Sequence, residues 1–308
     1  MNESTINIAL SIDHNFVQHC AVTIVSIMKS YKGTSKVMFY IINDDLTAGN
    51  ESDLKRLLQN HKFEITFIKI DKQMFKDMPV GGHTISDAIS LSAYYRIALS
   101  QLLPPKIKKI IYLDADIYVN DSIDKLWQMD LTGYAIAGVP QPQCLATKKR
   151  LEIPNNFKYV NSGVSIMNLT LMREIDYTHK AIEYAQNNFN KIIYHDQDIA
   201  NALLYDKTLY LPYKWNMVDC YLYKKPPLSG KALNEVITYQ NTPSIIHFAG
   251  YLKPWHKECR NPYRNLYWKA LQNTPWENSP KKFREKTWFK ELKLIIKLIL
   301  KRPTYFKL

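Results

Sequence analysis

The chain has 308 residues, of which 46% are hydrophobic and 22% charged, and its formal net charge is +13. This length and composition allow one large domain with a sizeable core, and they exclude a disordered, collagenous or low-complexity protein. The four cysteines are widely spaced and form no CxxC pattern, which argues against a disulfide scaffold or a thiolate metal site and favours a reducing compartment. No signal-peptide pattern is present and no apolar run reaches the ~18 residues of a membrane span, so we expect a soluble, cytoplasmic protein.

Strand-like and helix-like patterns alternate through the first 115 residues. Apolar runs predict strands at residues 6–12, 37–42, 63–70 and 109–113, and helical periodicity occurs at 16–31, 53–60 and 89–102. This alternation predicts a doubly wound, mostly parallel α/β sheet. Ligands bind beyond the carboxyl ends of the strands in such sheets, and Asp13 and the Asp114/Asp116 pair stand at such ends.

The pattern loosens after about residue 125. Residues 133–139 and 164–169 are strand-like, 196–204 are helical, and 141–159 and 212–225 look irregular. No internal repeat is present. We therefore expect one Rossmann-like catalytic domain over residues 1–277, followed by a separate tail over residues 278–308.

The tail is strongly basic, with ten lysines and arginines against two glutamates. A helix over residues 288–302 would place Lys290, Lys293, Lys297 and Lys301 in one stripe beside a broad apolar face. Such a helix suits an anionic lipid surface, although it would also fit a helix packed on the body with solvated lysines. We expect peripheral association with the inner face of the cell membrane, and no nucleic-acid partner because a basic groove with aromatic side chains is missing.

Common nucleotide and hydrolase motifs are absent from the sequence, including GxxxxGK[ST], GxGxxG after the first strand, and GxSxG. The sequence Asp114-Ala115-Asp116 follows a strongly apolar run, and residues two apart in an extended segment project to the same side. Two carboxylates at one place suit Mg²⁺ or Mn²⁺, which can bridge to phosphates.

A second unusual segment is HFAGYLKPWH, residues 247–256. A nitrogen ligand from His247 would shift the metal preference toward Mn²⁺. Gly250 would allow close approach of backbone to a phosphate, and Lys253 would offer it a positive charge. A lone histidine after an apolar pair is ordinarily a core residue, but the nearby glycine and lysine favour a site.

These segments together resemble the retaining glycosyltransferases of family 8, which include bacterial lipooligosaccharide galactosyl- and glucosyltransferases and are related to glycogenin. The similarity extends over residues 6–262 and implies a GT-A type fold. Asp114, Asp116 and His247 match the ligands of the family's Mn²⁺, with Mg²⁺ as the alternative. Gly250 and Lys253 match its diphosphate-binding loop.

The resemblance implies further contacts to the UDP-sugar, and the segments that carry them are SIDHNF, LSAYYRI, VNSGVSIMNL and HDQDIAN. Serine and glycine stand after the asparagine of VNSG where the family commonly has NAG. The implied nucleotide-sugar residues are Ser11, Asp13, Asn15, Arg96, Ala115 and Asn161, and the implied catalytic residues are Asp196 and Gln197.

The resemblance implies retaining transfer of glucose or galactose from a UDP-hexose to a hydroxyl of a glycan or glycolipid acceptor such as lipopolysaccharide. An amide is a poor nucleophile, so Asp196 is chemically the better candidate than Gln197 for a covalent or acid–base role. Of the two routes to retention we favour front-face attack assisted by the leaving phosphate, with Asp196 binding sugar hydroxyls. Two alternatives remain: a metal-dependent nucleotidyltransferase or phosphohydrolase, which leaves HFAGYLKPWH unexplained, and a membrane-binding module without turnover.

Overall fold

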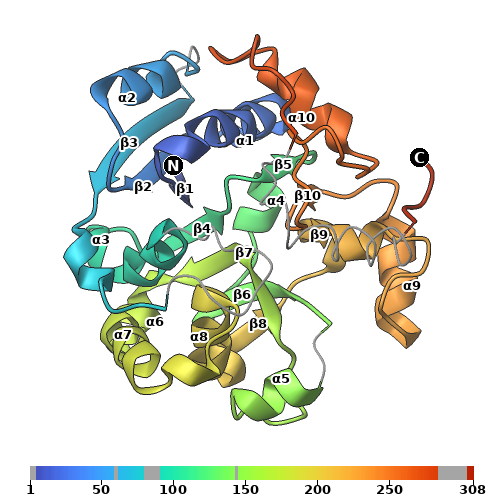
Figure 1. Ribbon diagram of the computed structural model, residues 1–308. Helices are drawn as coiled ribbons and strands as arrows, with labels where there is room; N and C mark the ends of the chain where they lie inside the picture. The colour runs from blue at the N-terminus through green and yellow to red at the C-terminus, as the bar shows by residue number, and fades with distance from the viewer. Residues whose placement is uncertain (1–4, 59–61, 80–90, 143–144, 284–303) are drawn as a thin grey trace.

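The computed structural model describes residues 5–58, 62–79, 91–142, 145–283 and 304–308. A seven-stranded sheet runs through the middle of these residues (Figure 1). Its strands are β1 (Ile6–Ser11), β2 (Val37–Asn43), β3 (Phe63–Lys69), β4 (Lys109–Leu113), β6 (Ile136–Pro140), β7 (Val160–Asn168) and β8 (Thr208–Tyr210). They lie in the order β3-β2-β1-β4-β7-β6-β8.

Strand direction confirms the predicted sheet and adds one reversal. Strands β3, β2, β1 and β4 are mutually parallel, and β8 is parallel to β6. Strand β7 is antiparallel to both of its neighbours. Its sequence could not reveal this, because a strand buried on both faces reads as a continuous apolar run in either direction.

Helices cover both faces of the sheet (Figure 1), because alternate residues of each central strand point to opposite sides. Ile111 and Leu113 of β4 pack in the core beneath α1 (Val17–Ser30), α2 (Ala48–Lys55) and α10 (Arg264–Leu271). Ile110 and Tyr112 pack in the core on the other face. The elements there are the 3₁₀-helix η3 (Leu91–Ala98), α3 (Leu99–Leu102), α6 (Leu169–Glu174), α7 (Tyr177–Asn187) and α8 (His195–Leu204).

The remaining helices are short or peripheral. The α-helices are α4 (Asp124–Trp127), α5 (Leu145–Arg150) and α9 (Gly230–Tyr239). The 3₁₀-helices are η1 (His14–Phe16), η2 (Lys72–Phe75), η4 (Phe189–Lys191), η5 (Tyr205–Lys207), η6 (Tyr213–Trp215) and η7 (Asp219–Leu222).

A small second sheet brings distant segments of the chain to the end of β4. It consists of β5 (Ile117–Val119), β10 (Ile245–His247) and β9 (Met217–Val218), with β10 in the middle. His247 stands opposite Ile117 in the antiparallel pair β5–β10 and opposite Val218 in the parallel pair β10–β9. Since β5 begins just after residue 116, this pairing places His247 beside the aspartates at the end of β4.

Four predicted segments differ from the structure. The segment 212–225, predicted to be irregular, contains η6, β9 and η7. The helix predicted at 53–60 is α2, which starts earlier because Thr47 and Asn50 form a capping box, and it ends at Lys55. The helix predicted at 89–102 is a 3₁₀-helix over Leu91–Ala98, where apolar residues recur every three positions as that helix favours, and only its last turn, Leu99–Leu102, is α-helical. The predicted loop 141–159 contains the six-residue α5.

Other expectations concern the whole chain. The helix predicted over residues 288–302 lies outside the described residues. None of the helices in the described part of the chain is long and apolar enough to cross a bilayer. The cysteines that the structure describes, Cys20, Cys220 and Cys259, are all free.

Candidate functional site

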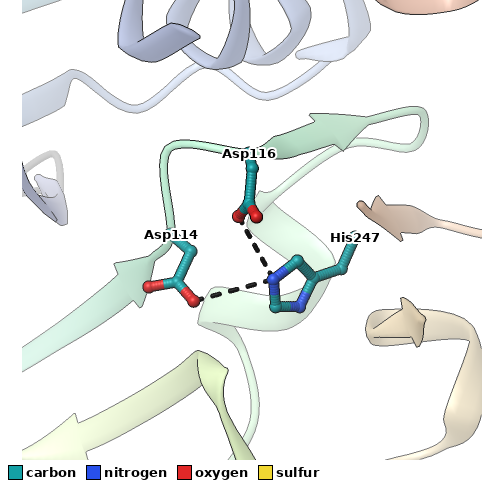
Figure 2. Close-up of side chains that lie close together, drawn as sticks. All are labelled: Asp114, Asp116 and His247. Atoms are coloured by element: carbon teal, nitrogen blue, oxygen red, sulfur yellow. Dashed lines mark ion pairs between the residues drawn. The ribbon is translucent and has the colours of Figure 1, made fainter. Parts of the chain in front are cut away.

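The three predicted metal ligands lie together at the carboxyl end of β4. Asp114 follows β4, Asp116 precedes β5 and His247 ends β10, and all three side chains point toward one another (Figure 2). His247 Nε2 lies 3.6 Å from Asp114 Oδ2 and 3.2 Å from Asp116 Oδ1. One potential ligand atom from each residue lies within 4.8 Å of the others. Two carboxylates and an imidazole form a donor set that fits a divalent cation such as Mn²⁺.

The backbone between the two aspartates is a turn and not the extended segment that the sequence predicted. Thr23 on α1 holds this turn, since its Oγ1 donates to the carbonyl of Ala115 at 3.0 Å and to that of Ile117 at 2.8 Å. The convergence of Asp114 and Asp116 was therefore predicted correctly but for the wrong reason. A buried hydroxyl beneath the turn, and not strand pleating, holds the backbone that carries both carboxylates.

Each aspartate divides its two oxygens between a cationic side chain and the histidine. Arg96 Nη2 lies 2.7 Å from Asp114 Oδ1, and Lys253 Nζ lies 2.6 Å from Asp116 Oδ2. The second oxygen of each carboxylate faces His247. Burial alone would raise the pKa of Asp116, but the charge of Lys253 and the contact with His247 hold it well below its ordinary value. Asp116 is therefore a carboxylate at neutral pH.

Gly163 on β7 forms the floor of this cluster. A Cβ at this position would overlap His247 Cε1 and would lie 2.5 Å from Asp114 Oδ2. Only a glycine leaves the space in which the carboxylate and the imidazole can both face the same point. The VNSG segment thus contributes a residue to the cluster that sequence reasoning had not singled out.

Arg96 connects the cluster to Asp196 at the start of α8. Its Nε lies 3.0 Å from Asp196 Oδ2, and both side chains are less than 10% exposed. Burial raises the pKa of Asp196 to about 6; the Arg96 charge opposes this shift and the Asp114 charge adds to it. Burial would lower the pKa of Arg96, but Asp114 and Asp196 raise it above its ordinary value. Arg96 therefore stays charged between two acids.

Asn161 and Gln197 are in direct contact. Asn161 Nδ2 donates to Gln197 Oε1 at 2.9 Å and to Gln141 Oε1 at 3.0 Å, and Gln197 Nε2 donates to Tyr159 at 3.0 Å. His195, immediately before Asp196 and Gln197, has a φ of 49°. A non-glycine residue in the left-handed region carries backbone strain, a feature that clusters at functional sites.

The predicted uracil-side residues follow β1, the parallel neighbour of β4, and so stand at the same edge of the sheet. Ser11 ends β1, and Asp13 caps η1 by accepting a hydrogen bond from the backbone nitrogen of Asn15 at 2.9 Å. Asn15 is exposed. The structure thus places Ser11, Asp13 and Asn15 at the edge of the sheet where the metal-ligand cluster lies.

The loop after His247 is held from two sides. Asp219 Oδ2 accepts a hydrogen bond from the backbone nitrogen of Gly250 at 2.8 Å, and a Cβ on Gly250 would lie 2.9 Å from that oxygen. Trp255 stacks on His19 of α1 with ring centroids 3.5 Å apart. Lys253, between these two anchors, also donates to the carbonyl of Phe248 at 2.8 Å. The glycine is thus explained by the close approach of Asp219.

Besides Gly163, sequence reasoning missed Asp219 and Asn216. Both are buried, and both lie in the segment 212–225 that was predicted to be irregular. Asp219 also accepts hydrogen bonds from Asn261 and Tyr305, and Asn216 contacts His247. The available signal was two small polar residues within the otherwise aromatic and apolar sequence WNMVDCYL.

Comparison with known proteins decides the family. Residues 7–259 match the family described as Glycosyl transferase family 8. This chain belongs to glycosyltransferase family 8. It is 30% identical to General stress protein A of Bacillus subtilis strain 168 over 86% of this chain and 92% of that protein. It is 29% identical to Lipopolysaccharide 1,2-glucosyltransferase of Escherichia coli K12 over 90% of this chain and 80% of that protein.

A solved structure shows the same fold. The galactosyltransferase LgtC, in complex with donor and acceptor sugar analogues, superimposes with a TM-score of 0.78 at 22% sequence identity, covering 89% of this chain and 99% of LgtC. The predicted family and the predicted α/β fold of GT-A type are thereby confirmed. The chain is a glycosyltransferase of the hexosyltransferase type.

Proposed function

We propose that this family 8 glycosyltransferase moves glucose or galactose from a UDP-sugar to a hydroxyl of a surface glycan such as lipopolysaccharide, with retention of the anomeric configuration. The observation that carries the proposal is the convergence of Asp114, Asp116 and His247 beside Lys253. Relatives named for lipopolysaccharide synthesis support the acceptor class, including a Lipopolysaccharide 1,3-galactosyltransferase of Salmonella typhimurium that is 25% identical to this chain.

Asp114 Oδ2, Asp116 Oδ1 and His247 Nε2 would hold Mn²⁺, with Mg²⁺ as the alternative. When bound, the cation acts as a Lewis acid that stabilises the negative charge developing on the diphosphate leaving group. Lys253 adds a second positive charge. Lys253 Nζ lies 2.6 Å from Asp116 Oδ2, so this charge would stand beside the cation and the diphosphate.

The nucleotide would lie along the edge formed by the ends of β1 and β4. Ser11, Asp13 and Asn15 would contact the uracil and nearby groups, and Ala115 would contact the nucleotide from the turn between the aspartates. Gly250 would bring its backbone to the diphosphate. This placement agrees with the binding of ligands beyond the carboxyl ends of parallel strands.

The donor sugar would lie against Arg96, Asn161, Asp196 and Gln197. Asp196 Oδ2 is already paired with Arg96, which makes this carboxylate a better partner for sugar hydroxyls than a nucleophile. We therefore favour front-face attack. The bond from C1 to the diphosphate oxygen breaks while the acceptor oxygen bonds to C1 on the same face, and the acceptor's proton passes to the departing diphosphate oxygen.

We also propose that residues 278–308 bring the enzyme to the anionic inner face of the cell membrane, where a lipid-linked acceptor is concentrated. Described residues at both ends of this segment contact the catalytic body. The backbone nitrogen of Lys257 donates to the carbonyl of Lys282 at 2.9 Å, and that of Lys224 donates to the carbonyl of Thr304 at 2.7 Å. The domain boundary at residue 277 stays a prediction.

Product analysis tests the reaction. Purified protein is incubated with Mn²⁺, a truncated lipopolysaccharide acceptor, and either UDP-glucose or UDP-galactose. We expect one donor to add a single hexose to the acceptor, detected by mass spectrometry, with the α configuration of the donor preserved in the NMR spectrum of the product. A β-linked product would contradict retention, and transfer of a phosphate-bearing group would contradict hexosyl transfer.

A further inference from the structure

A chain of hydrogen bonds leads from the backbone of β7 to His247. The backbone nitrogen of Gly163 donates to Asn161 Oδ1 at 3.0 Å, which identifies this atom of Asn161 as the oxygen. Asn216 Nδ2 lies 2.8 Å from the same oxygen. Because an oxygen can only accept here, Asn216 must present its amide nitrogen to Asn161, and its own Oδ1 must point the other way.

That oxygen of Asn216 lies 2.9 Å from His247 Nδ1. An amide oxygen accepts but never donates, so in the hydrogen bond Nδ1 of the imidazole carries the hydrogen. In the neutral ring the lone pair is then on Nε2. Nε2 is the atom that faces Asp114 Oδ2 at 3.6 Å and Asp116 Oδ1 at 3.2 Å.

Both asparagines in this series of hydrogen bonds, Asn161 and Asn216, have fixed positions. Asn216 is fully buried between η6 and β9, and β9 pairs in register with β10, which carries His247. At the other end, Gln197 Oε1 accepts hydrogen bonds from the backbone nitrogen of Ser162 at 3.2 Å and from Asn161 Nδ2 at 2.9 Å. Backbone donors therefore fix the orientation of the amides at Asn161 and at Gln197.

We infer that Asn216 is a positioning residue which, together with Asn161, holds His247 in the tautomer that offers Nε2 to the divalent cation. The inference rests on the proposed metal site. With the other tautomer, His247 would aim an N–H at the cation and could not ligate it. Asn161 Oδ1 accepts from Asn216 and so acts on His247 through that residue. Asn161 Nδ2 donates to Gln197 and Gln141, on the side where we place the donor sugar.

Two variants of Asn216 and one control separate this role from general stability. Asn216→Leu removes the acceptor for Nδ1–H, whereas Asn216→Asp keeps that acceptor and replaces only the amide nitrogen that faces Asn161 Oδ1. Asn168→Leu is the matched control, because Asn168 Oδ1 accepts from the backbone nitrogen of Leu171 but stands opposite Lys109, at the far end of β4. Two quantities are measured on the full-length proteins: Mn²⁺ affinity by electron paramagnetic resonance, and the tautomer of His247.

The tautomer is measured without metal, from long-range ¹H–¹⁵N spectra of histidine-labelled protein at a pH where the imidazole is neutral. The signals of His247 are identified by their loss in His247→Asn. We expect Nδ1–H in the wild type and in Asn216→Asp, and loss of that preference in Asn216→Leu. We expect Mn²⁺ affinity to fall about 10- to 100-fold in Asn216→Leu and to stay close to wild type in Asn216→Asp and Asn168→Leu.

The outcomes separate the inference from the proposed function. If the wild type binds Mn²⁺ but its neutral His247 carries the hydrogen on Nε2, the inference is wrong. The same conclusion follows if Asn216→Leu binds Mn²⁺ as tightly as the wild type, or if Asn216→Asp loses affinity as strongly as Asn216→Leu. If the wild type shows Nδ1–H but binds neither Mn²⁺ nor Mg²⁺, the proposed metal site is wrong although the tautomer was assigned correctly.

Discussion

Arg96 and Lys253 each occupy one oxygen of an aspartate whose other oxygen faces His247. This division orients both carboxylates before any cation binds, so little rearrangement is needed at the inward-facing atoms. It also limits the electrostatic cost of placing two acids, Asp116 mostly buried and Asp114 partly buried, side by side, because each has a cationic partner. At the scale of single residues, the site is therefore shaped as much by the partners of the ligands as by the ligands themselves.

Gly163→Ala tests how closely the cluster is packed. The added methyl group would overlap His247 and Asp114, so we expect Mn²⁺ affinity and UDP-sugar turnover to fall by about tenfold or more. Calorimetric titration with Mn²⁺ measures the first effect. The control is Gly49→Ala in α2, where the new Cβ would lie 3.6 Å from its nearest neighbour. This substitution should stabilise the helix by about 0.5–1 kcal/mol. Unchanged Mn²⁺ affinity in Gly163→Ala would contradict the packing argument.

Asp196 predicts a pH dependence of stability in the metal-free enzyme. Its pKa is about 6 in the folded protein, against an ordinary value of 3.8. Between these values the unfolded chain has lost the proton that the folded protein keeps, so this residue's contribution to stability falls as the pH rises from about 4 to about 6. Asn at this position does not titrate. We expect the melting temperature of Asp196→Asn, relative to the wild type, to rise across that range, and a constant difference would contradict the raised pKa.

At the scale of elements, the first half of the fold was readable because its signals are local. Strands β1 to β4 are mostly apolar segments with helices between them, and the acids after β1 and β4 mark the ligand-binding edge. The direction of β7 and the 3₁₀ form of η3 were not predicted. The sequence of a strand that is buried on both faces does not depend on the strand's direction. To predict a 3₁₀-helix, the spacing of apolar residues must be recognised as 3.0 residues per turn and not 3.6.

The site residues, too, are partly those with a local sequence signal and partly those without one. Asp114, Asp116, His247, Gly250 and Lys253 were found because each stands in a short, distinctive motif. Asn216 and Asp219 were not, because their roles depend on partners 31 residues away or more, at His247, Asn161 and Gly250. A contact of this kind follows from the pairing of β9 with β10, which only the folded structure shows.

Asp219→Asn tests the anchoring of the loop that carries Lys253. An amide cannot accept from Gly250, Asn261 and Tyr305 as the carboxylate does, so the loop loses at least one hydrogen bond. We expect UDP affinity to fall about fivefold, as the loss of roughly 1 kcal/mol implies, while Mn²⁺ affinity stays unchanged because β10 still holds His247. Titrations with UDP and with Mn²⁺ measure both. The control Asp206→Asn changes an exposed residue and should alter neither UDP affinity nor Mn²⁺ affinity. If Asp219→Asn lost both affinities equally, the loop and the metal site would not be held independently.

At the scale of the whole molecule, the basic C-terminal segment and the catalytic site are connected. Tyr305 pairs with Tyr223, and its hydroxyl donates to Asp219 Oδ1 at 3.1 Å. Asp219 in turn holds Gly250. Deleting residues 278–308 would therefore remove a partner of the diphosphate loop together with the proposed membrane contact, so substitutions in the full-length chain are the cleaner test.

Replacing Lys290, Lys293, Lys297 and Lys301 by glutamine should abolish binding to vesicles that contain anionic lipid, because each lysine near such a surface contributes about 1 kcal/mol. Turnover of the soluble donor should not change. Vesicle co-sedimentation at low and high salt measures the effect. The matched control replaces four exposed lysines of the body by glutamine, namely Lys32, Lys106, Lys180 and Lys231. Equal loss of binding in both variants would assign the effect to net charge and would contradict a specific role of the tail.

The most direct test of the whole account is UDP release from UDP-glucose and UDP-galactose by the wild type and by Asp116→Asn, measured with Mn²⁺, with Mg²⁺ and with EDTA. Asp130→Asn, on an exposed turn, serves as the control. We predict that UDP release requires a divalent cation, is fastest with Mn²⁺ and favours one of the two sugars. In Asp116→Asn the rate of release should fall roughly 100-fold or more, and in Asp130→Asn it should not change. Release that persists in EDTA, or that survives in Asp116→Asn, would contradict the assignment of Asp114, Asp116 and His247 as the metal site of this glycosyltransferase.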